Sequence, residues 1–482
     1  MINWWLIVLA VIIGILVLGL SAYLLLYYGS EEDNGEAYLS KLIVVLGMCL
    51  ACGIVLLLPY DVAAKVDPSA ASKFTVQIDT ETMWEIVLWA CAAFVIVLIP
   101  FANFYYEAYD PDEDKPGKQI SQAVMYTLGI CACMVGLTLV LWTTVGEAVI
   151  PYYSYMCNAQ LMGPDSSTLV YYNNKTIVDM YLKVSIFVYA VAMMCGAGWI
   201  LFFVYGGVGL VAFPVDTIRD FMNRPKAISG AVFHQEMEII AGKAQLLIKI
   251  GEELTKASRK RSIAGSVKNK INTLRNEAYL LENQQERLIW AFEQAGGSPF
   301  VVYGAPLIGI IGAIISAMWI IHIFVYNTLD ASPFLNVMLI DLDNAFSLLG
   351  VAAYALFAFY LLWCTFKGQI KIGMRLLFFQ IHPMKQGDTT VNSLLFNVGL
   401  LLAAAIAVVQ FSARSFQEYA ANTAISALLN AYVIRLKGVG PVISYLQYVF
   451  VGVSGLAIIW VVICPNRQRR QDMLKMKRPE DD

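Results

Sequence analysis

A serine and a histidine in separate apolar stretches are the residues that could most readily do covalent chemistry. Ser454 stands in Gly452-Val453-Ser454-Gly455, which matches the G-x-S-G pattern of intramembrane serine proteases, and His322 could serve as its base. Such a nucleophile needs the base within hydrogen-bond reach and donors for an oxyanion. The match spans four residues in a chain with 34 glycines, and small residues are common in membrane helices because they let helices approach closely. We therefore interpret the match as coincidence.

The other candidate sites also favour structural roles. Tyr205-Gly206-Gly207-Val208-Gly209 ends an apolar stretch and does not follow a strand, so it is not a nucleotide-binding loop. With Pro214, it indicates a break in that stretch. His322 is the one ionisable residue that we place well inside a stretch, where a lone histidine is more often a packing residue than a proton relay. The nine cysteines suggest neither a disulfide framework nor a metal cluster. We predict a protein that is not an enzyme and needs no metal or cofactor.

These residues would be positioned by nine apolar stretches, each long enough to cross a bilayer. A helix rises about 1.5 Å per residue and the hydrocarbon layer is roughly 30 Å thick, so a crossing needs about 20 apolar residues. Hydrophobic residues make up 59% of the 482 and charged residues 14%, against roughly 25% charged residues in soluble domains. The sequence therefore predicts an all-α polytopic membrane protein. The predicted spans are Leu6–Tyr28, Leu42–Tyr60, Met83–Tyr105, Ala123–Val145, Val184–Phe213, Pro306–Tyr326, Ala345–Trp363, Leu394–Val409 and Ile443–Ile463.

The positive charges predict an orientation for these spans. With the amino terminus outside, 26 of the 33 Lys and Arg residues fall in connections on the inner side and seven on the outer side. Cytoplasmic loops are enriched in positive charge, so we expect the amino terminus outside and the carboxyl terminus in the cytosol. On the outer side, Asn174-Lys175-Thr176 is an N-glycosylation sequon, which makes Asn174 a candidate glycosylation site.

The chain divides into residues 1–214 with five spans, 215–302 with a cytoplasmic helical hairpin, 303–464 with four spans, and a charged tail over 465–482. Two apolar seams with heptad-like spacing, Ile240–Leu254 and Val267–Phe292, flank the basic segment Lys256–Gly265. This pattern predicts an antiparallel coiled-coil hairpin. It could be a self-packed stalk or an arm that docks a partner, such as a second copy of the chain.

A further amphipathic segment is predicted near residues 367–382. Basic and apolar residues alternate from Ile370 to Ile381, which we interpret as an amphipathic helix at the inner leaflet. His382 and Pro383 follow, and Pro383 would stop that helix. We interpret His382 and Pro383 as structural residues that fix the junction with the eighth span.

Several segments along the whole chain carry a resemblance to a known family. They are Phe104-Tyr105-Tyr106-Glu107, Tyr205-Gly206-Gly207-Val208-Gly209, Arg224-Pro225-Lys226-Ala227, Ser332-Pro333-Phe334-Leu335-Asn336, Ile381-His382-Pro383-Met384-Lys385 and Asn392-Ser393-Leu394-Leu395-Phe396-Asn397-Val398-Gly399. With them the chain resembles the limb-region membrane protein family, which includes the lipocalin-interacting membrane receptor and the lysosomal cobalamin transport escort protein. It is most similar to the branch found in plants and protists. The resemblance implies nine spans, a cytoplasmic hairpin after the fifth, and a non-enzymatic role with a lipocalin-type or cobalamin-type ligand system.

Two functions are compatible with these observations. The first is a homodimeric multi-pass receptor, scaffold or transport-assisting protein of the plasma membrane or an endolysosomal membrane, acting through its hairpin, with no nucleic-acid partner. The second is a secondary transporter of a large amphipathic solute such as a vitamin or lipid. A transporter should show internal repeats, and the two halves of this chain show no convincing repeat. This favours the first function.

Overall fold

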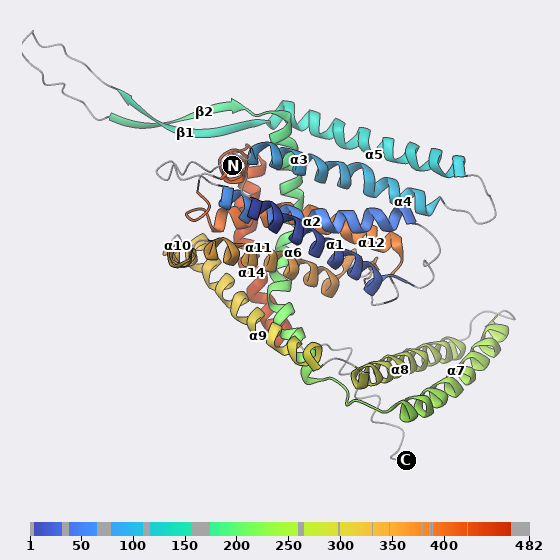
Figure 1. The fold of residues 1–482 in the computed structure, drawn as a ribbon. Coiled ribbons are helices and arrows are strands. Elements are labelled where there is room, and N and C mark those ends of the chain that lie inside the picture. The colour runs from blue at the N-terminus through green and yellow to red at the C-terminus, as the bar shows by residue number, and fades with distance from the viewer. Residues whose placement is uncertain are drawn as a thin grey trace, which may run out of the picture. The chain divides into compact units, whose positions relative to one another are not determined.

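The computed structural model describes residues 4–30, 38–64, 79–108, 116–156, 174–258, 265–296, 299–329, 331–346, 348–376, 379–382, 384, 387, 389–421 and 423–463. Nine helical spans within these residues are long and apolar enough to cross a membrane. This confirms the predicted fold class (Figure 1). The spanning elements are α1 (Trp4–Tyr28), α2 (Tyr38–Ala64), α3 (Thr80–Ala93) with its continuation α4 (Ile99–Glu107), α5 (Pro116–Val145), α6 (Ile186–Met222), α9 (Pro299–His322), α11 (Leu349–Ile372), α12 (Val391–Ser415) and α14 (Val439–Ile463).

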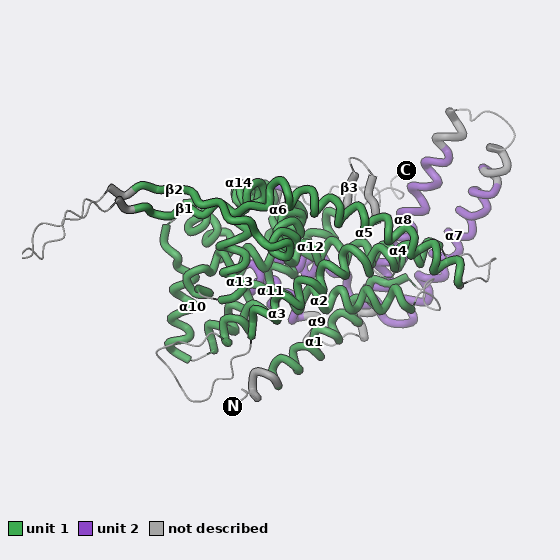
Figure 2. The backbone as a smooth tube through the Cα atoms, turned by 90° about the horizontal axis from the view of Figure 1, so that it is seen from above, with its two compact units in different colours: residues 1–212, 315–457 green, residues 213–314, 458–482 purple. Residues whose placement is uncertain are grey.

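The chain forms two compact units, residues 1–212 with 315–457 and residues 213–314 with 458–482 (Figure 2). The division falls within helices α6, α9 and α14. Besides the spans, the first unit contains α10 (Phe334–Ala345), the short α13 (Ala424–Ser426) and two strand pairs. The second unit contains α7 (Gly230–Ser258) and α8 (Gly265–Gly296).

In the part of the chain that the structure describes, three π-helical turns interrupt or extend other helices. They are η2 (Phe94–Leu98) between α3 and α4, η3 (Ile323–Thr328) directly after α9, and η4 (Ala427–Val433) directly after α13. Such turns are rare and occur frequently at functional sites. None of these π-helical turns was predicted from the sequence.

Helix α12 is the centre of the first unit. In its most apolar window 78% of the residues are buried, against 6% for α5 and 11% for α1. A helix that is apolar on all sides is either enclosed by protein or faces lipid, so α12 is enclosed whereas α1 and α5 are lipid-facing. The aromatic rings of Trp199 and Phe202 on α6, Phe411 on α12 and Phe450 on α14 pack together, with centroids 4.9–5.6 Å apart. They form the core around α12.

The expected break in the fifth span is wrong. Helix α6 runs through Pro214 to Met222 without interruption. Proline has no N–H, so a proline inside a helix leaves the carbonyl four residues earlier without its usual donor. Here that carbonyl belongs to Leu210, and the hydroxyl of Ser316 on α9 donates to it at 2.5 Å. The neighbouring helix therefore supplies the missing donor and the proline is tolerated.

The amphipathic helix predicted near 367–382 is also wrong beyond Ile372. Helix α11 ends there, Gly373 follows with a φ of 62°, and the chain continues as the antiparallel strands β3 (Met374–Leu376) and β4 (Phe379–Ile381). A left-handed glycine commonly ends a helix. The alternation of basic and apolar residues has a period of two, which is the period of a strand.

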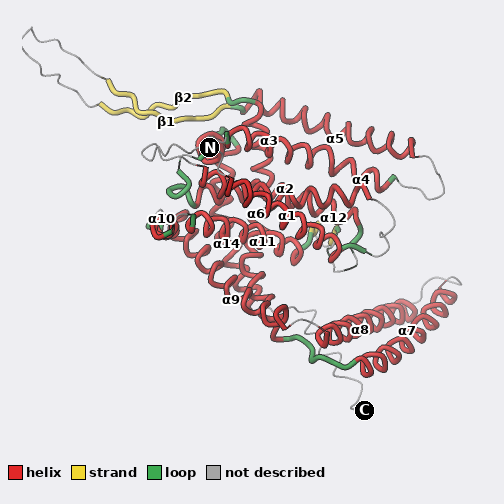
Figure 3. Tube along the Cα trace, in the orientation of Figure 1, coloured by secondary structure: helices red, strands yellow, loops and turns green. Residues whose placement is uncertain are grey.

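A second strand pair in the first unit was not anticipated. Strands β1 (Glu147–Met156) and β2 (Asn174–Lys183) form an antiparallel ribbon with Glu147 opposite Lys183 (Figure 3). At its base the Val149 N–H donates to the carbonyl of Arg435, and the Lys437 N–H donates to the carbonyl of Glu147. The segment between the fourth and fifth spans therefore contains a ribbon that is fixed to the loop before α14.

Candidate functional site

Side chains from three other elements converge on the carboxyl end of α12. The last four carbonyls of a helix have no partner within it, and in α12 each of them has a donor. Asn336 Nδ2 on α10 and His322 Nε2 on α9 both lie 3.0 Å from the carbonyl oxygen of Ser415. Asn430 Nδ2 on η4 donates to the carbonyl of Ala413 at 3.2 Å. The carbonyls of Ser412 and Arg414 accept from the N–H groups of Phe416 and Gln417.

The fully buried His322 is held in one orientation within this cluster. A carbonyl can only accept, so the 3.0 Å contact with the Ser415 oxygen places a proton on Nε2. The neutral ring then presents Nδ1 as an acceptor, and no described residue forms a hydrogen bond to Nδ1. The ring stacks between Tyr326 and Phe416, with centroids 5.2 and 5.6 Å away. This environment fits the packing role that the sequence suggested.

Two aspartates extend the cluster. Asp343 on α10 accepts from the hydroxyl of Tyr419 at 2.6 Å and from the Gly350 N–H, at the start of α11, at 2.7 Å. Burial, followed by the nearby Asp343, raises the pKa of Tyr419, which lies in the loop after α12. The buried Asp61 on α2 accepts from Trp84 Nε1 at 2.8 Å and from the Ile425 N–H at 3.1 Å. His322 is therefore not the only ionisable side chain buried in this unit.

Besides the Ser412 hydroxyl and Asn327 Oδ1, three further buried polar atoms at this end of α12 have no hydrogen-bond partner among the described residues. Asn430 donates to a carbonyl through Nδ2, so its unpartnered atom is Oδ1. Gln410 accepts from Trp199 Nε1 through Oε1, so its unpartnered atom is Nε2. The Tyr354 hydroxyl is the third. Unpartnered buried polar atoms are uncommon, and each is a place where a water molecule or a polar ligand group can bind.

The structure does not bring Ser454 and His322 together as a catalytic pair. The Ser454 hydroxyl donates to the carbonyl of Phe450 in its own helix at 2.9 Å, and its oxygen lies against Gly207. His322 is bonded to Ser415. Among the described residues there is also no group of three or more His, Cys, Asp or Glu side chains that could hold a metal ion.

Gly206, Gly207 and Gly209 allow α6 to pass very close to two other helices. A Cβ at Gly206 would lie 3.1 Å from the Phe450 ring, and a Cβ at Gly207 would lie 3.0 Å from Val453, both on α14. A Cβ at Gly209 would overlap the carbonyl of Cys364 on α11, and one at Gly368 on α11 would overlap the carbonyl of Tyr205. These glycines are positions of close helix packing, so the motif has a structural role.

His382 joins the loop after β4 to the start of α12. Its Nδ1 lies 3.1 Å from the Ser393 hydroxyl, and its carbonyl accepts from Asn397 Nδ2 at 3.0 Å. Asn397 in turn accepts from Gln369 Nε2 on α11 at 3.0 Å. His382 also has a φ of 51°, which is unusual outside glycine. Pro383 lies outside the described residues. Asn174 is the first residue of β2, and its side chain is also not described.

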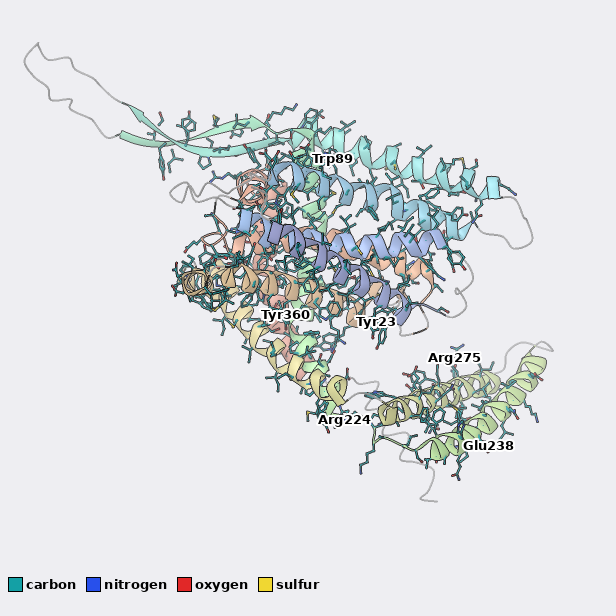
Figure 4. All side chains as sticks on the ribbon, in the orientation of Figure 1. Tyr23, Trp89, Arg224, Glu238, Arg275 and Tyr360 are labelled. Atoms are coloured by element: carbon teal, nitrogen blue, oxygen red, sulfur yellow. The ribbon has the colours of Figure 1, made fainter. Side chains whose placement is uncertain are left out.

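The second unit presents a surface of a different kind. Helices α7 and α8 lie antiparallel, with Phe233 stacked on Phe292 at 4.4 Å and the Ile228 N–H donating to the Ala291 carbonyl. The predicted α7 seam faces α8, since Ile240 is buried and the other seam residues are half-buried. Figure 4 shows the charged side chains of the hairpin, with Glu238 labelled on α7 and Arg275 on α8. Several large apolar residues of α7 nevertheless remain exposed.

Comparisons with known proteins agree with the motifs described above. The sequence profile of the LMBR1-like membrane protein family matches residues 6–294 and 299–426. A LIMR family protein of Dictyostelium discoideum is 32% identical over 91% of this chain and 93% of its own length. LIMR family proteins of Oryza sativa subsp. japonica and Arabidopsis thaliana are 33% and 31% identical over 97% of this chain, covering 98% and 97% of their own lengths. No solved structure matches the chain significantly.

Proposed function

The chain belongs to the LMBR1-like membrane protein family, and on that basis we propose that it is a multi-pass membrane receptor, scaffold or transport-assisting protein that docks a partner on the α7–α8 hairpin. The observation that carries this proposal is the apolar surface of α7. Its seam is already occupied by α8, yet Ile239 and Leu246, which share another face of the helix, are 46% and 61% exposed. Large apolar side chains grouped on a soluble helix mark interaction sites.

The interior of the first unit supports a non-enzymatic role. The polar side chains near α12 are used mainly to satisfy the end of that helix, and the Ser454 hydroxyl is used within its own helix. We therefore place the activity of the protein on its hairpin, which we expect in the cytosol from the charge distribution.

Affinity capture from native membranes tests this function. Wild type is compared with a deletion of residues 235–293 and with Leu246→Asp, and Ile248→Asp is the matched control because both side chains are equally exposed. Loss of the same partner proteins with the deletion and with Leu246→Asp, but not with Ile248→Asp, supports docking. An unchanged set of partners for the deletion would make the hairpin a stalk and refute the proposal.

A secondary transporter of a large amphipathic solute is the second candidate. The observation that favours it is the group of unpartnered polar atoms around the end of α12, namely His322 Nδ1, Asn430 Oδ1, Gln410 Nε2 and the Tyr354 hydroxyl. A solute with polar groups could bind there. Reconstituted protein with Gln410→Leu should then lose solute accumulation in vesicles, whereas a docking protein would show no accumulation in either form.

A further inference from the structure

Helix α7 carries two apolar stripes, and α8 covers only one of them. The covered seam contains Ile240 and Leu247. A second set of apolar residues recurs at intervals of seven, seven and four residues, which places its members on one face of the helix. This outer stripe consists of Val232, Ile239, Leu246 and Ile250, which are 45%, 46%, 61% and 45% exposed.

The outer stripe has the spacing of a helix–helix contact. Single exposed apolar residues are normal on protein surfaces, but four on one face of a helix at heptad intervals form a continuous seam. Gly242 lies beside the stripe at its middle, and no atom lies within 4 Å of the position that a Cβ would occupy there. Glycine in a helix interior costs about 0.5–1 kcal/mol relative to alanine. A close approach by another backbone would give Gly242 a role.

The charges beside the stripe indicate what covers it. On one flank Glu236 is followed seven residues later by Lys243, and on the other Glu238 is followed eleven residues later by Lys249. Seven and eleven residues are close to two and three helical turns, so each acid shares a flank with its lysine. All four side chains are exposed. Between residues 236 and 249, each flank is therefore acidic first and basic after it.

This order of charges is complementary to itself in the antiparallel sense. In an antiparallel pair of identical helices the same flanks face each other, so Glu236 meets the partner's Lys243 and Glu238 meets the partner's Lys249. The first pairing centres the two-fold axis between residues 239 and 240 and the second centres it between residues 243 and 244, so the mean position lies next to Gly242. A parallel pair would bring acids beside acids and lysines beside lysines, which is unfavourable.

We propose that the outer stripe of α7 is covered by the same stripe of a second copy of this chain, in an antiparallel pair with its two-fold axis near Gly242. This inference rests on the proposed docking function and names the partner. An isologous contact of this kind closes a dimer and leaves no free surface for further growth. A lipid surface fits less well, because a helix that lies on a membrane has a polar face rich in Lys and Arg. Acidic residues are as numerous as lysines beside this stripe.

Cross-linking in the purified full-length protein tests the geometry. Single cysteines are introduced by Gly242→Cys and by Val232→Cys, with wild type and its nine native cysteines as the background, and a short bismaleimide is added. In the antiparallel pair the two copies of residue 242 are adjacent, whereas those of residue 232 are roughly 28 Å apart at 1.5 Å per residue. We expect a cross-linked dimer only with Gly242→Cys. Dimers with Val232→Cys as well would refute the antiparallel arrangement, and none with either would refute the pair.

Charge exchange tests the partner independently. Lys249→Glu should weaken the dimer about tenfold, since it turns two exposed ion pairs into repulsive ones, and adding Glu238→Lys should restore it. Leu246→Asp should dissociate the dimer, and Ile248→Asp, equally exposed on another face of α7, should not. The readout is the dimer fraction against protein concentration by mass photometry. A dimer fraction that none of these substitutions changes would refute the inference. The proposal that the hairpin docks other partners would not be affected by that result.

Discussion

The crossing of α6 and α11 permits the sharpest test of the fold. At Gly209 an added Cβ would lie 2.5 Å from the carbonyl carbon of Cys364 and would overlap its oxygen. Carbon atoms that are not bonded pack at about 3.5 Å. Gly209→Ala must therefore force the two helices apart by about 1 Å. Gly368→Ala should have a similar effect, because its Cβ would lie 2.8 Å from the carbonyl carbon of Tyr205.

The cost of this separation follows from lost packing. A buried side chain makes about 40–60 contacts of roughly 0.1–0.2 kcal/mol each, and a gap of 0.5–1 Å loses a quarter to a half of each contact. For two neighbouring side chains on the crossing, the loss of a quarter is about 3 kcal/mol. For a chain of 482 residues this should lower the apparent melting temperature by about 3 °C. Gly209→Ala with Gly368→Ala should cost less than the sum of the two single changes, because both act on one crossing.

Thermal unfolding in detergent, followed by fluorescence-detected size exclusion, measures the effect. The matched controls are Gly452→Ala and Gly455→Ala on α14, where no atom lies within 4 Å of an added Cβ. These controls should change stability by less than about 1 kcal/mol. A Gly209→Ala protein as stable as wild type would refute the close crossing. Full stability of the two controls would also show that the G-x-S-G glycines are not needed for packing.

Three further predictions concern buried polar groups, and each is measured as the change in thermal stability. Ser316→Ala should cost about 1–3 kcal/mol, because the Leu210 carbonyl loses its donor and the Tyr360 hydroxyl loses the Ser316 oxygen. Adding Pro214→Ala should recover the share that comes from Leu210, since alanine restores the N–H, and no recovery would contradict the explanation. Asn397→Ala should cost about 2–4 kcal/mol, because two groups that bond to its side chain lose their partners, and a cost below 1 kcal/mol would contradict this. The pKa of Tyr419 is raised in the folded protein. Its contribution to stability is therefore complete below the ordinary tyrosine pKa of about 10 and declines as the pH rises above that value. Tyr419→Phe should lessen this decline in stability, and an unchanged dependence of stability on pH would argue against the shift.

The spans could be predicted because the requirement for them is local. A crossing needs a run of apolar residues of sufficient length, and each of the nine runs became a helix. The family could be recognised for a similar reason, because its motifs are short segments in a fixed order. The segment from Gly373 to Ile381 failed because its period of two was interpreted as a helical pattern. The left-handed glycine at its start was the available signal.

The cluster at the end of α12 could not be predicted, because it depends on which helix ends meet in space. Three different elements supply its side chains, namely Asn336 on α10, Asn430 on η4 and His322 on α9. These side chains have in common only that they bond to carbonyls at the end of α12. Asp61 was missed for the same reason. Its burial becomes acceptable only when Trp84 and the Ile425 N–H supply donors, and neither donor is visible from the residues around Asp61.

The two stripes of α7 show where sequence and structure contribute separately. Both stripes can be found from the spacing of apolar residues, but the spacing cannot say which one faces α8. The structure decides this, because Ile240 is buried while Leu246 is 61% exposed. Once the outer stripe is known to be uncovered, the order of acids and lysines beside it becomes informative again. Those charges would have no preferred partner on a solvated face, whereas on an uncovered apolar face they select an antiparallel copy of the same helix.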